Sequence, residues 1–423
     1  MSFAEAQPVL RAFAGSGFAG ADVANAGVWE QWEGEKDRLI RARVERGLED
    51  SISNLLIYGV SFTTQPRLAD WTQALSPDGE LTPVMAARLR DLLAAVQRAS
   101  PSPLAPAERI AAVRHVLQEV PEAEWEGRLR ANLLRFVAEQ QHYATQVEAF
   151  KGKSETDASV LLRSSLYAAR GLSADTSLPP NFAIFDTLEA LRRKGVLKPG
   201  AIHAIGVVGP GLDFANKRDG LDFYPPQTVQ PFAVADAVVR LGLQAPGEPK
   251  LVAYDLNPAV LEHARRARDR ATYRLQLPLD SDAPWTPEVV RYWQTLGTRV
   301  GLNVTPLRTP AAVGKVRMRA VAVAPRWLHA LQAQDLDIVL QTALPAPQLD
   351  LVVATNILVY YSPFEQALAL HNIAGLLAPG GLFIGNTILP GGAEADLEFL
   401  GRRKVIYTRD GSFGDDVVVY RKR

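Results

Sequence analysis

The chain has 423 residues, 47% of them hydrophobic, so it is long enough for two or three domains with a large buried core. Its 46 basic and 46 acidic residues balance, which argues against binding a nucleic-acid backbone or an anionic membrane as the main task. The absence of cysteine excludes disulfides, cysteine-ligated metals and thiol catalysis, and no apolar run is long enough to span a bilayer, so we expect a cytoplasmic protein, bacterial by its Ala- and Arg-rich composition.

The first part of the chain, residues 1–180, is predicted to form an all-helical domain. Apolar residues recur there at helical spacing, and turn-forming clusters at Ser76–Gly79 and Ser100–Pro103 separate the helical segments. No motif in this region indicates a chemistry. The predicted apolar faces are Leu48, Ile52, Leu55 and Leu56; Met85, Leu89, Leu92 and Val96; Ile110, Val113 and Leu117; and Leu129, Leu133, Phe136 and Val137.

The remainder, residues 181–423, is predicted to form an α/β domain, because strand-length apolar stretches alternate with helices. We expect a doubly wound, Rossmann-like, seven-stranded and mostly parallel sheet that ends in an antiparallel hairpin. Two segments, Arg319–Val323 and Asp337–Leu340, are candidates for the third strand. The other predicted strands are Ile202–Val208, Leu251–Tyr254, Leu349–Ala354, Gly381–Ile384, Lys404–Thr408 and Asp416–Arg421, and the predicted helices are Asn181–Lys194, Thr228–Leu241, Pro258–Arg270 and Pro363–Leu377.

Two features at the ends of the first strands are candidates for ligand contacts. The turn Gly209-Pro210-Gly211 follows the first strand, where glycines let the backbone approach a ligand, and Asp255 ends the second, where a carboxylate can accept hydrogen bonds from ribose hydroxyls. Phe214 stands where a dinucleotide fingerprint has its third glycine. Each feature alone also fits a simple turn without a ligand.

Further motifs follow in order, Thr355–Tyr361 after the fourth strand and Leu377–Gly381 before the fifth. With the segment Ala253–Asn257, their order and spacing over Leu251–Asn386 resemble the methyltransferase domain of the CheR family, the glutamate methyltransferases of chemotaxis receptors. That family belongs to the class I methyltransferases, which use S-adenosylmethionine (SAM). The resemblance therefore implies a methyltransferase sheet and SAM as the cofactor.

The resemblance also implies roles for individual residues. Asp255 would bind the ribose with Leu256 beside it, and the turn residues Gly209 and Gly211 would approach the cofactor. Tyr360 would lie beside the transferred methyl group and, with Asn356, is the candidate catalytic residue. The remaining implied cofactor contacts are Asp337 and Ile338 around the adenine, and Asn356 and Ile357 along the methionine or ribose.

The chain departs from the CheR pattern at three places. Thr355 replaces an arginine, Val207 replaces the acid usual at the end of the first strand in class I enzymes, and the family's Gly-Glu-Glu-Pro-Tyr motif is missing. Asp213 is a candidate for the lost carboxylate, facing the cofactor's amino group. The long loop Asp213–Gln227 is either a lid or substrate wall, or a surface insertion. Before the domain, Thr176, Ser177 and Asn181 are either cofactor contacts or part of a linker and helix cap.

Three functions remain open. The first is an active SAM-dependent methyltransferase whose acceptor, a small molecule or a protein side chain, is unidentified. The second is a CheR-like protein carboxyl methyltransferase in which an insertion at Arg274–Lys315 recognises the partner. The third is a non-catalytic SAM- or nucleoside-binding or scaffold protein with a degenerate methyltransferase fold. No metal site is expected, and the basic residues Arg265, Arg266 and Arg268 indicate a solvated helix face.

Overall fold

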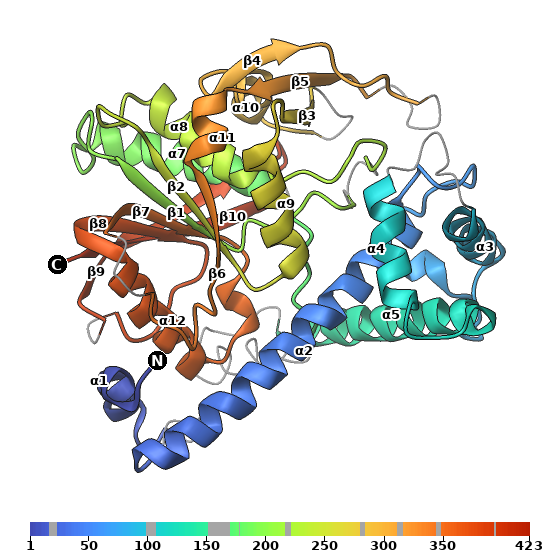
Figure 1. Ribbon diagram of the computed structural model, residues 1–423, viewed down its shortest axis with the longest axis horizontal. Coiled ribbons are helices and arrows are strands. Elements are labelled where there is room, and N and C mark those ends of the chain that lie inside the picture. Colours follow the sequence, from blue (N-terminus) through green and yellow to red (C-terminus); the bar gives the residue numbers. More distant parts are fainter. Residues whose placement is uncertain are drawn as a thin grey trace.

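A helical region and a larger α/β region lie side by side in the computed structural model of the chain (Figure 1). The structure describes residues 1–16, 23–98, 107–150, 170–176, 178–215, 221–279, 284–310, 316–343, 348–392 and 395–423. The predicted break at Ser100–Pro103 lies outside these residues, as does Ser177.

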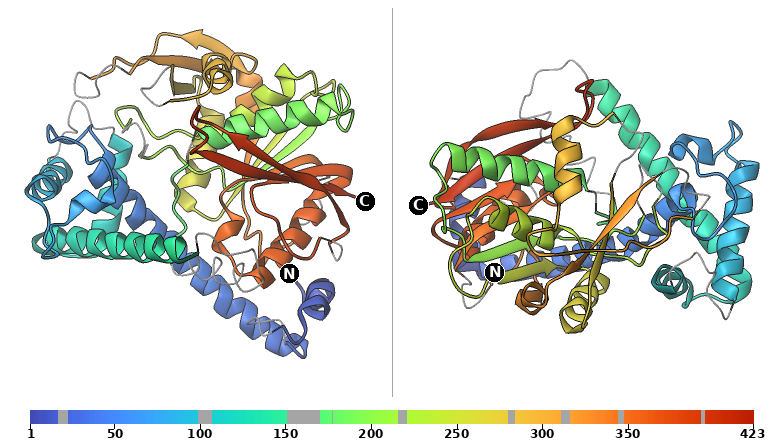
Figure 2. Two further views of the ribbon diagram at one scale, coloured as in Figure 1. Left: turned by 180° about the vertical axis from the view of Figure 1, so that it is seen from behind. Right: turned by 90° about the horizontal axis from the view of Figure 1, so that it is seen from above.

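A seven-stranded sheet with the strand order β6-β2-β1-β7-β8-β10-β9 forms the centre of the α/β region (Figure 2). The pairs from β6 to β8 are parallel, and β10 runs antiparallel to both of its neighbours. This arrangement confirms the predicted fold class. The strands are β1 (Ala204–Val208), β2 (Lys250–Asp255), β6 (Leu331–Asp335), β7 (Leu349–Ala354), β8 (Leu377–Gly385), β9 (Leu397–Ile406) and β10 (Gly414–Lys422).

Helices cover both faces of the sheet, which explains why β1 is apolar along its whole length and β7 at every position except Asp350. All five residues of β1 are buried, as are the last four of β7. Local capping starts the helices as the sequence predicts: the Asn257 side chain caps α9, and Ser362 forms a capping box with Glu365 at the start of α12. The covering helices are α7 (Pro179–Arg193), α8 (Gln230–Arg240), α9 (Pro258–Asp269) and α12 (Pro363–Leu376).

The third strand of the sheet is β6, and neither predicted candidate forms it. Arg319–Val323 lies in β5 of a separate sheet, and Asp337–Leu340 is a turn after β6. In this turn the backbone N–H groups of Val339 and Leu340 donate to Asp337 Oδ1 at 2.9 and 3.2 Å. The strand β6 has no apolar pattern because it is an edge strand and four of its five residues are at least partly exposed.

The predicted insertion between α9 and the third strand is a small unit of its own. It contains the antiparallel sheet β3-β5-β4 and a short helix, and it lies at the top in Figure 1. It extends beyond the predicted end at Lys315, because β5 pairs with both of the other strands. Its elements are β3 (Arg274–Pro278), α10 (Pro287–Thr295), β4 (Gly301–Val304) and β5 (Met318–Val323), and α11 (Pro325–Ala330) leads on to β6.

The helical region contains α1 (Phe3–Phe13), α2 (Ala26–Tyr58), α3 (Pro83–Gln97), α4 (Ala107–Leu117) and α5 (Trp125–Phe150), with 3-10 turns at Trp71–Ala74 and Glu122–Glu124. Its core contains all the predicted apolar faces except Leu48, which is half-buried. The predicted turn at Ser76–Gly79 is present, with Gly79 at a φ of 83°.

The start of the chain packs on the α/β region instead. Ala6, Trp29 and Ile40 are buried in the core between the sheet and α12. The rings of Phe13 and Trp32 contact Phe364 of α12 with centroid distances of 5.7 and 5.5 Å. The long helix α2 therefore crosses from one core to the other (Figure 1).

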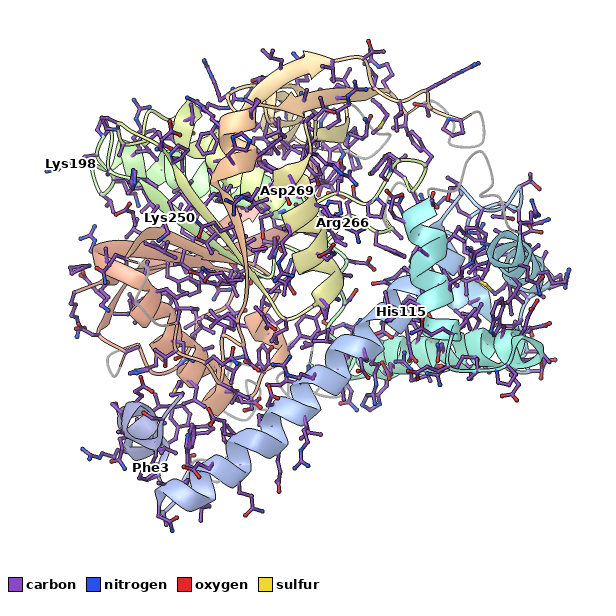
Figure 3. All side chains as sticks on the ribbon, viewed as in Figure 1. Phe3, His115, Lys198, Lys250, Arg266 and Asp269 are labelled. Atoms are coloured by element: carbon purple, nitrogen blue, oxygen red, sulfur yellow. The ribbon has the colours of Figure 1, made fainter. Side chains whose placement is uncertain are left out.

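The basic stretch on α9 forms a solvated face, as predicted. Arg266 points outward on this helix (Figure 3), has 65% of its side chain exposed, and pairs with Glu262 at 2.7 Å. None of the described helices combines the length and hydropathy that crossing a bilayer requires.

Asp337 gives a prediction about stability. Its side chain is fully buried, burial raises its pKa to about 6, and within the described part of the chain its Oδ2 has no hydrogen-bond partner. Because the folded pKa lies above the unfolded value, wild-type stability falls as pH rises from about 4 to about 6. We expect D337N to keep the hydrogen bonds that Oδ1 accepts at the start of the turn. Its free energy of unfolding should exceed that of wild type by about 1–3 kcal/mol at pH 8, and this difference should vanish near pH 4. Urea unfolding at both pH values measures this, and an equal effect at both would contradict it.

Candidate functional site

A cavity of about 570 Å³ lies at the carboxyl ends of β1, β2 and β7. This is the edge at which open α/β sheets bind their ligands. Its walls also come from outside the sheet: Val44 of α2, the segment 172–176 ahead of α7, the insertion, and the loop between β9 and β10. The helical region and the insertion therefore both contribute to the site.

The glycine turn after β1 is fixed by its neighbours. Gly209 and Gly211 have φ values of 63° and 61°, a region that favours glycine. A Cβ at Gly209 would lie 2.2 Å from Ile357 Cδ1, and one at Gly211 would lie 2.6 Å from the carbonyl oxygen of Ala174. The backbone N–H of Leu212 donates to that same oxygen at 2.7 Å. The glycines thus let Ile357 and the segment 172–176 close on the turn.

Asp255 ends β2 at the cavity wall. Its Oδ1 accepts the backbone N–H of Asn257 at 2.8 Å, and Asn257 in turn caps α9. Burial raises the pKa of Asp255 to about 6, against the lowering effect of backbone N–H groups that include Gly211. Asp255 is therefore a carboxylate held in place by backbone N–H groups, and it borders a cavity large enough for a ligand.

Asp213 is a second carboxylate at the cavity, and it is only 3% exposed. Its Oδ2 accepts from the hydroxyl of Tyr224 at 2.7 Å and from Nε2 of Gln227 at 3.0 Å. Burial raises its pKa, while these bonds and the charge of Arg109 oppose the shift. The carboxylate is therefore held in place by the residues of its own loop.

In its described part, the loop that carries Asp213 is buried, so it is neither an exposed lid nor a surface insertion, and Asp213 and Ala215 make it part of the cavity wall. Leu221, Phe223 and Tyr224 are buried, and residues 216–220 lie outside the described chain. Asp222 accepts the backbone N–H of Val60 at 2.9 Å. Phe214 enters the core of the helical region, while Leu221, Phe223 and Tyr224 pack against Val316 and Met318 of the insertion. The loop is therefore packed against both of these parts.

Arg109 of α4 also holds this loop from the helical side, through four backbone carbonyls. Its guanidinium, 1% exposed, donates to the backbone carbonyls of Asp213 and Asp222 at 3.0 and 2.8 Å, and also to those of Phe214 and Tyr224. Buried guanidinium groups are stable only when their donors are satisfied in this way.

The segment after β7 brings the two candidate catalytic residues to the cavity. Asn356 has a φ of 59°, a left-handed conformation that asparagine tolerates, and its backbone N–H donates to Asn386 Oδ1 at 2.9 Å. Tyr360 is half-buried, and its carbonyl accepts from Arg43 at 2.9 Å. Burial raises the pKa of the Tyr360 hydroxyl, so this group stays protonated at neutral pH and suits an orienting role.

The structure brings most of the predicted site residues together. Thr176 also borders the cavity, whereas Asn181 donates to the carbonyl of Leu178 and is not part of the wall. Asp337 is likewise outside the wall, because its side chain turns back to cap its own turn. The predicted residues at the cavity are Gly209, Gly211, Asp213, Asp255, Leu256, Ile338, Asn356, Ile357 and Tyr360.

Sequence reasoning missed the wall residues that come from elsewhere in the chain. Trp285 and Trp293 belong to the insertion, and Arg409 and Phe413 to the loop between β9 and β10. None of them stands in a motif. The one available signal was an insertion with two tryptophans among the seven of the chain.

Comparisons with known proteins give structural likenesses alone. No family model and no curated protein matches the chain. Solved structures similar to it include a TehB-like SAM-dependent methyltransferase from Corynebacterium glutamicum, at 11% identity and a TM-score of 0.28 over 68% of this chain and 98% of that one. The N-methyltransferase NodS from Bradyrhizobium japonicum, in complex with S-adenosylhomocysteine, has 11% identity and a TM-score of 0.29 over 62% and 98%. The magnesium protoporphyrin IX methyltransferase of Synechocystis, with bound SAM, has 10% identity and a TM-score of 0.28 over 64% and 100%. Scores this low carry no argument about activity, so the fold assignment rests on the strand order and the site on its own geometry.

Proposed function

We propose that the protein is a SAM-dependent methyltransferase. One observation carries the proposal: two held carboxylates, Asp213 and Asp255, border one cavity at the carboxyl ends of a seven-stranded mostly parallel sheet. SAM presents a ribose diol, a cationic amino group and a flat base whose two faces suit apolar contacts. A carboxylate at the end of β2 suits the diol, and a second one after β1 suits the ammonium. Leu256 and Ile338, which also border the cavity, supply apolar surface for the base.

The residues of the chain would act by binding and orientation. When bound, SAM supplies an electrophilic methyl group on sulfur, and the acceptor's lone pair forms the new bond while the old bonding pair stays on sulfur. Asp255 would hold the ribose and Asp213 the amino group. Asn356 and the neutral Tyr360 hydroxyl would position the acceptor, and the surrounding apolar wall would exclude water.

Titration calorimetry with S-adenosylhomocysteine tests the cofactor assignment. We expect binding to wild type that weakens as the pH falls through about 6, because protonated Asp255 accepts less well from the ribose hydroxyls. D255N is expected to bind about 10–100-fold more weakly at pH 8 and to lose most of this pH dependence. D269N is the matched control and should bind like wild type, since Asp269 ends α9, is exposed and is not part of the cavity wall. No binding to wild type at millimolar concentration would overturn the proposal.

A binding protein without methyl transfer is the second candidate function. Val207, at the position where class I enzymes usually have an acid, is fully buried in the core and does not border the cavity. Among the described residues between β1 and α8, Asp213 is the acid at the cavity wall. The CheR-type kinship is a narrower version of the first proposal and rests on the motifs at Ala253–Asn257, Thr355–Tyr361 and Leu377–Gly381. Release of S-adenosylhomocysteine from SAM in the presence of acceptor mixtures separates transfer from binding alone.

A further inference from the structure

The insertion and the β9–β10 loop together build an aromatic wall of the cavity that the cofactor assignment does not use. Trp285 and Trp293 are 8% and 5% exposed, and both border the cavity with Phe413. The ring centroids of Trp285 and Phe413 are 6.3 Å apart. Large, nearly buried rings that still face a cavity favour a ligand with a bulky apolar body.

Backbone contacts hold the two parts of this wall together. The N–H of Thr286 donates to the carbonyl of Tyr407 at 2.8 Å, and the N–H of Arg409 donates to that of Pro284 at 2.8 Å. Trp285 also forms an isolated antiparallel bridge with Thr408. The aromatic wall is therefore fixed by hydrogen bonds between segments far apart in the chain.

One cation borders this wall. Arg409 is exposed, and its Nε donates to the carbonyl of Trp285 at 3.1 Å. Within the described part of the chain no carboxylate forms an ion pair with it. A guanidinium has five N–H donors, so four remain after the bond from Nε. Their planar arrangement matches a carboxylate.

We propose that the methyl acceptor is a small-molecule carboxylic acid with an aromatic or similarly bulky apolar body. Its body would lie against Trp285, Trp293 and Phe413, and its carboxylate would pair with Arg409. The carboxylate is the anchor in this arrangement. That this acid accepts a methyl group rests on the proposed methyltransferase function, whereas its binding rests on the residues of the aromatic wall and on Arg409.

Calorimetry with a matched pair of probes, 2-naphthoate and the neutral 2-naphthalenemethanol, tests the proposal with and without saturating S-adenosylhomocysteine. We expect wild type to bind the acid about tenfold or more tightly than the alcohol, because the charged pair forms beside an apolar wall. R409Q is expected to lose about tenfold in affinity for the acid and to keep its affinity for the alcohol. Tryptophan fluorescence gives a second readout, since quenching by the acid should shrink in W285F.

Two controls separate the possible failures. R402Q removes an exposed arginine of the same hairpin that pairs with Asp416 at 2.7 Å, outside the cavity, and should bind both probes like wild type. R409K restores a cation and should recover part of the affinity for the acid. Equal affinity of wild type for both probes, no binding of the acid, or an R409Q protein that binds the acid like wild type overturns the inference. If the wild-type protein does not bind S-adenosylhomocysteine, the methyltransferase proposal is overturned instead.

Discussion

R109M is expected to lower the free energy of unfolding by about 3–5 kcal/mol and to abolish S-adenosylhomocysteine binding at the cavity. The substitution keeps much of the side-chain volume but removes every donor. The buried carbonyls of Asp213, Phe214, Asp222 and Tyr224 then lose their shared partner. Because Asp213 borders the cavity, a displaced loop also removes a carboxylate from the site. Urea unfolding and calorimetry measure the two effects.

Two further variants interpret that result. R114M changes an arginine on the same helix that donates to the carbonyls of Val96 and Arg98 and does not touch the loop. It should cost less stability and leave ligand binding unchanged. R109K keeps the charge with fewer donors and should lie between wild type and R109M in ligand affinity. If R109M folds and binds S-adenosylhomocysteine like wild type, Arg109 does not position the loop.

G47A is expected to cost about 3 kcal/mol or more, which is a large effect for one methyl group. Gly47 lies where α2 crosses the segment ahead of α7, and an added Cβ would lie 2.0 Å from the carbonyl oxygen of Leu172. Gly171 faces α2 from the other segment, and a Cβ there would lie 2.6 Å from the backbone nitrogen of Gly47. Backbone atoms cannot rotate away as a flexible side chain does. The segment 172–176 must therefore move, and with it a wall of the cavity.

G34A is the matched control for this prediction, since Gly34 lies in the same helix and a Cβ there meets nothing within 4 Å. It should raise the free energy of unfolding by about 0.5–1 kcal/mol, because alanine favours the helix over glycine. Thermal unfolding of both variants, with S-adenosylhomocysteine titrations, gives the comparison. If G47A and G34A are equally stable, the contact between α2 and the segment 172–176 is not tight enough to exclude a methyl group.

The sequence predicts those parts of the fold that local patterns determine. Caps such as Asn257 and Ser362 start their helices where expected, and the apolar residues of strands such as β1 and β7 are buried on both faces. The edge strand β6 was missed because one side of it faces solvent and its pattern is polar. The apolar run after Asp337 mimics a strand, yet the aspartate side chain caps it into a turn.

The same distinction applies to the candidate site. Asp255 was predicted because the ends of parallel strands meet at one edge of a sheet, whatever the rest of the chain does. Asp213 was predicted as a replacement for the acid that the family pattern has at the end of the first strand, and both residues border the cavity. Arg109 was not found, because in α4 it is one polar residue near an apolar face, and its buried partners lie in a distant loop. Trp285 and Arg409 meet only through pairing between the insertion and the hairpin. Such contacts follow from tertiary placement, which local periodicity does not encode.

The path of α2 has a consequence for synthesis on the ribosome. The apolar residues of α1 and the start of α2, including Phe13 and Trp32, find their partner in Phe364 near the end of the chain. Translation proceeds at about 5–20 residues per second, so Phe364 is synthesised on the order of tens of seconds after these side chains. During this interval α1 and the start of α2 expose apolar side chains, the kind of surface that molecular chaperones cover.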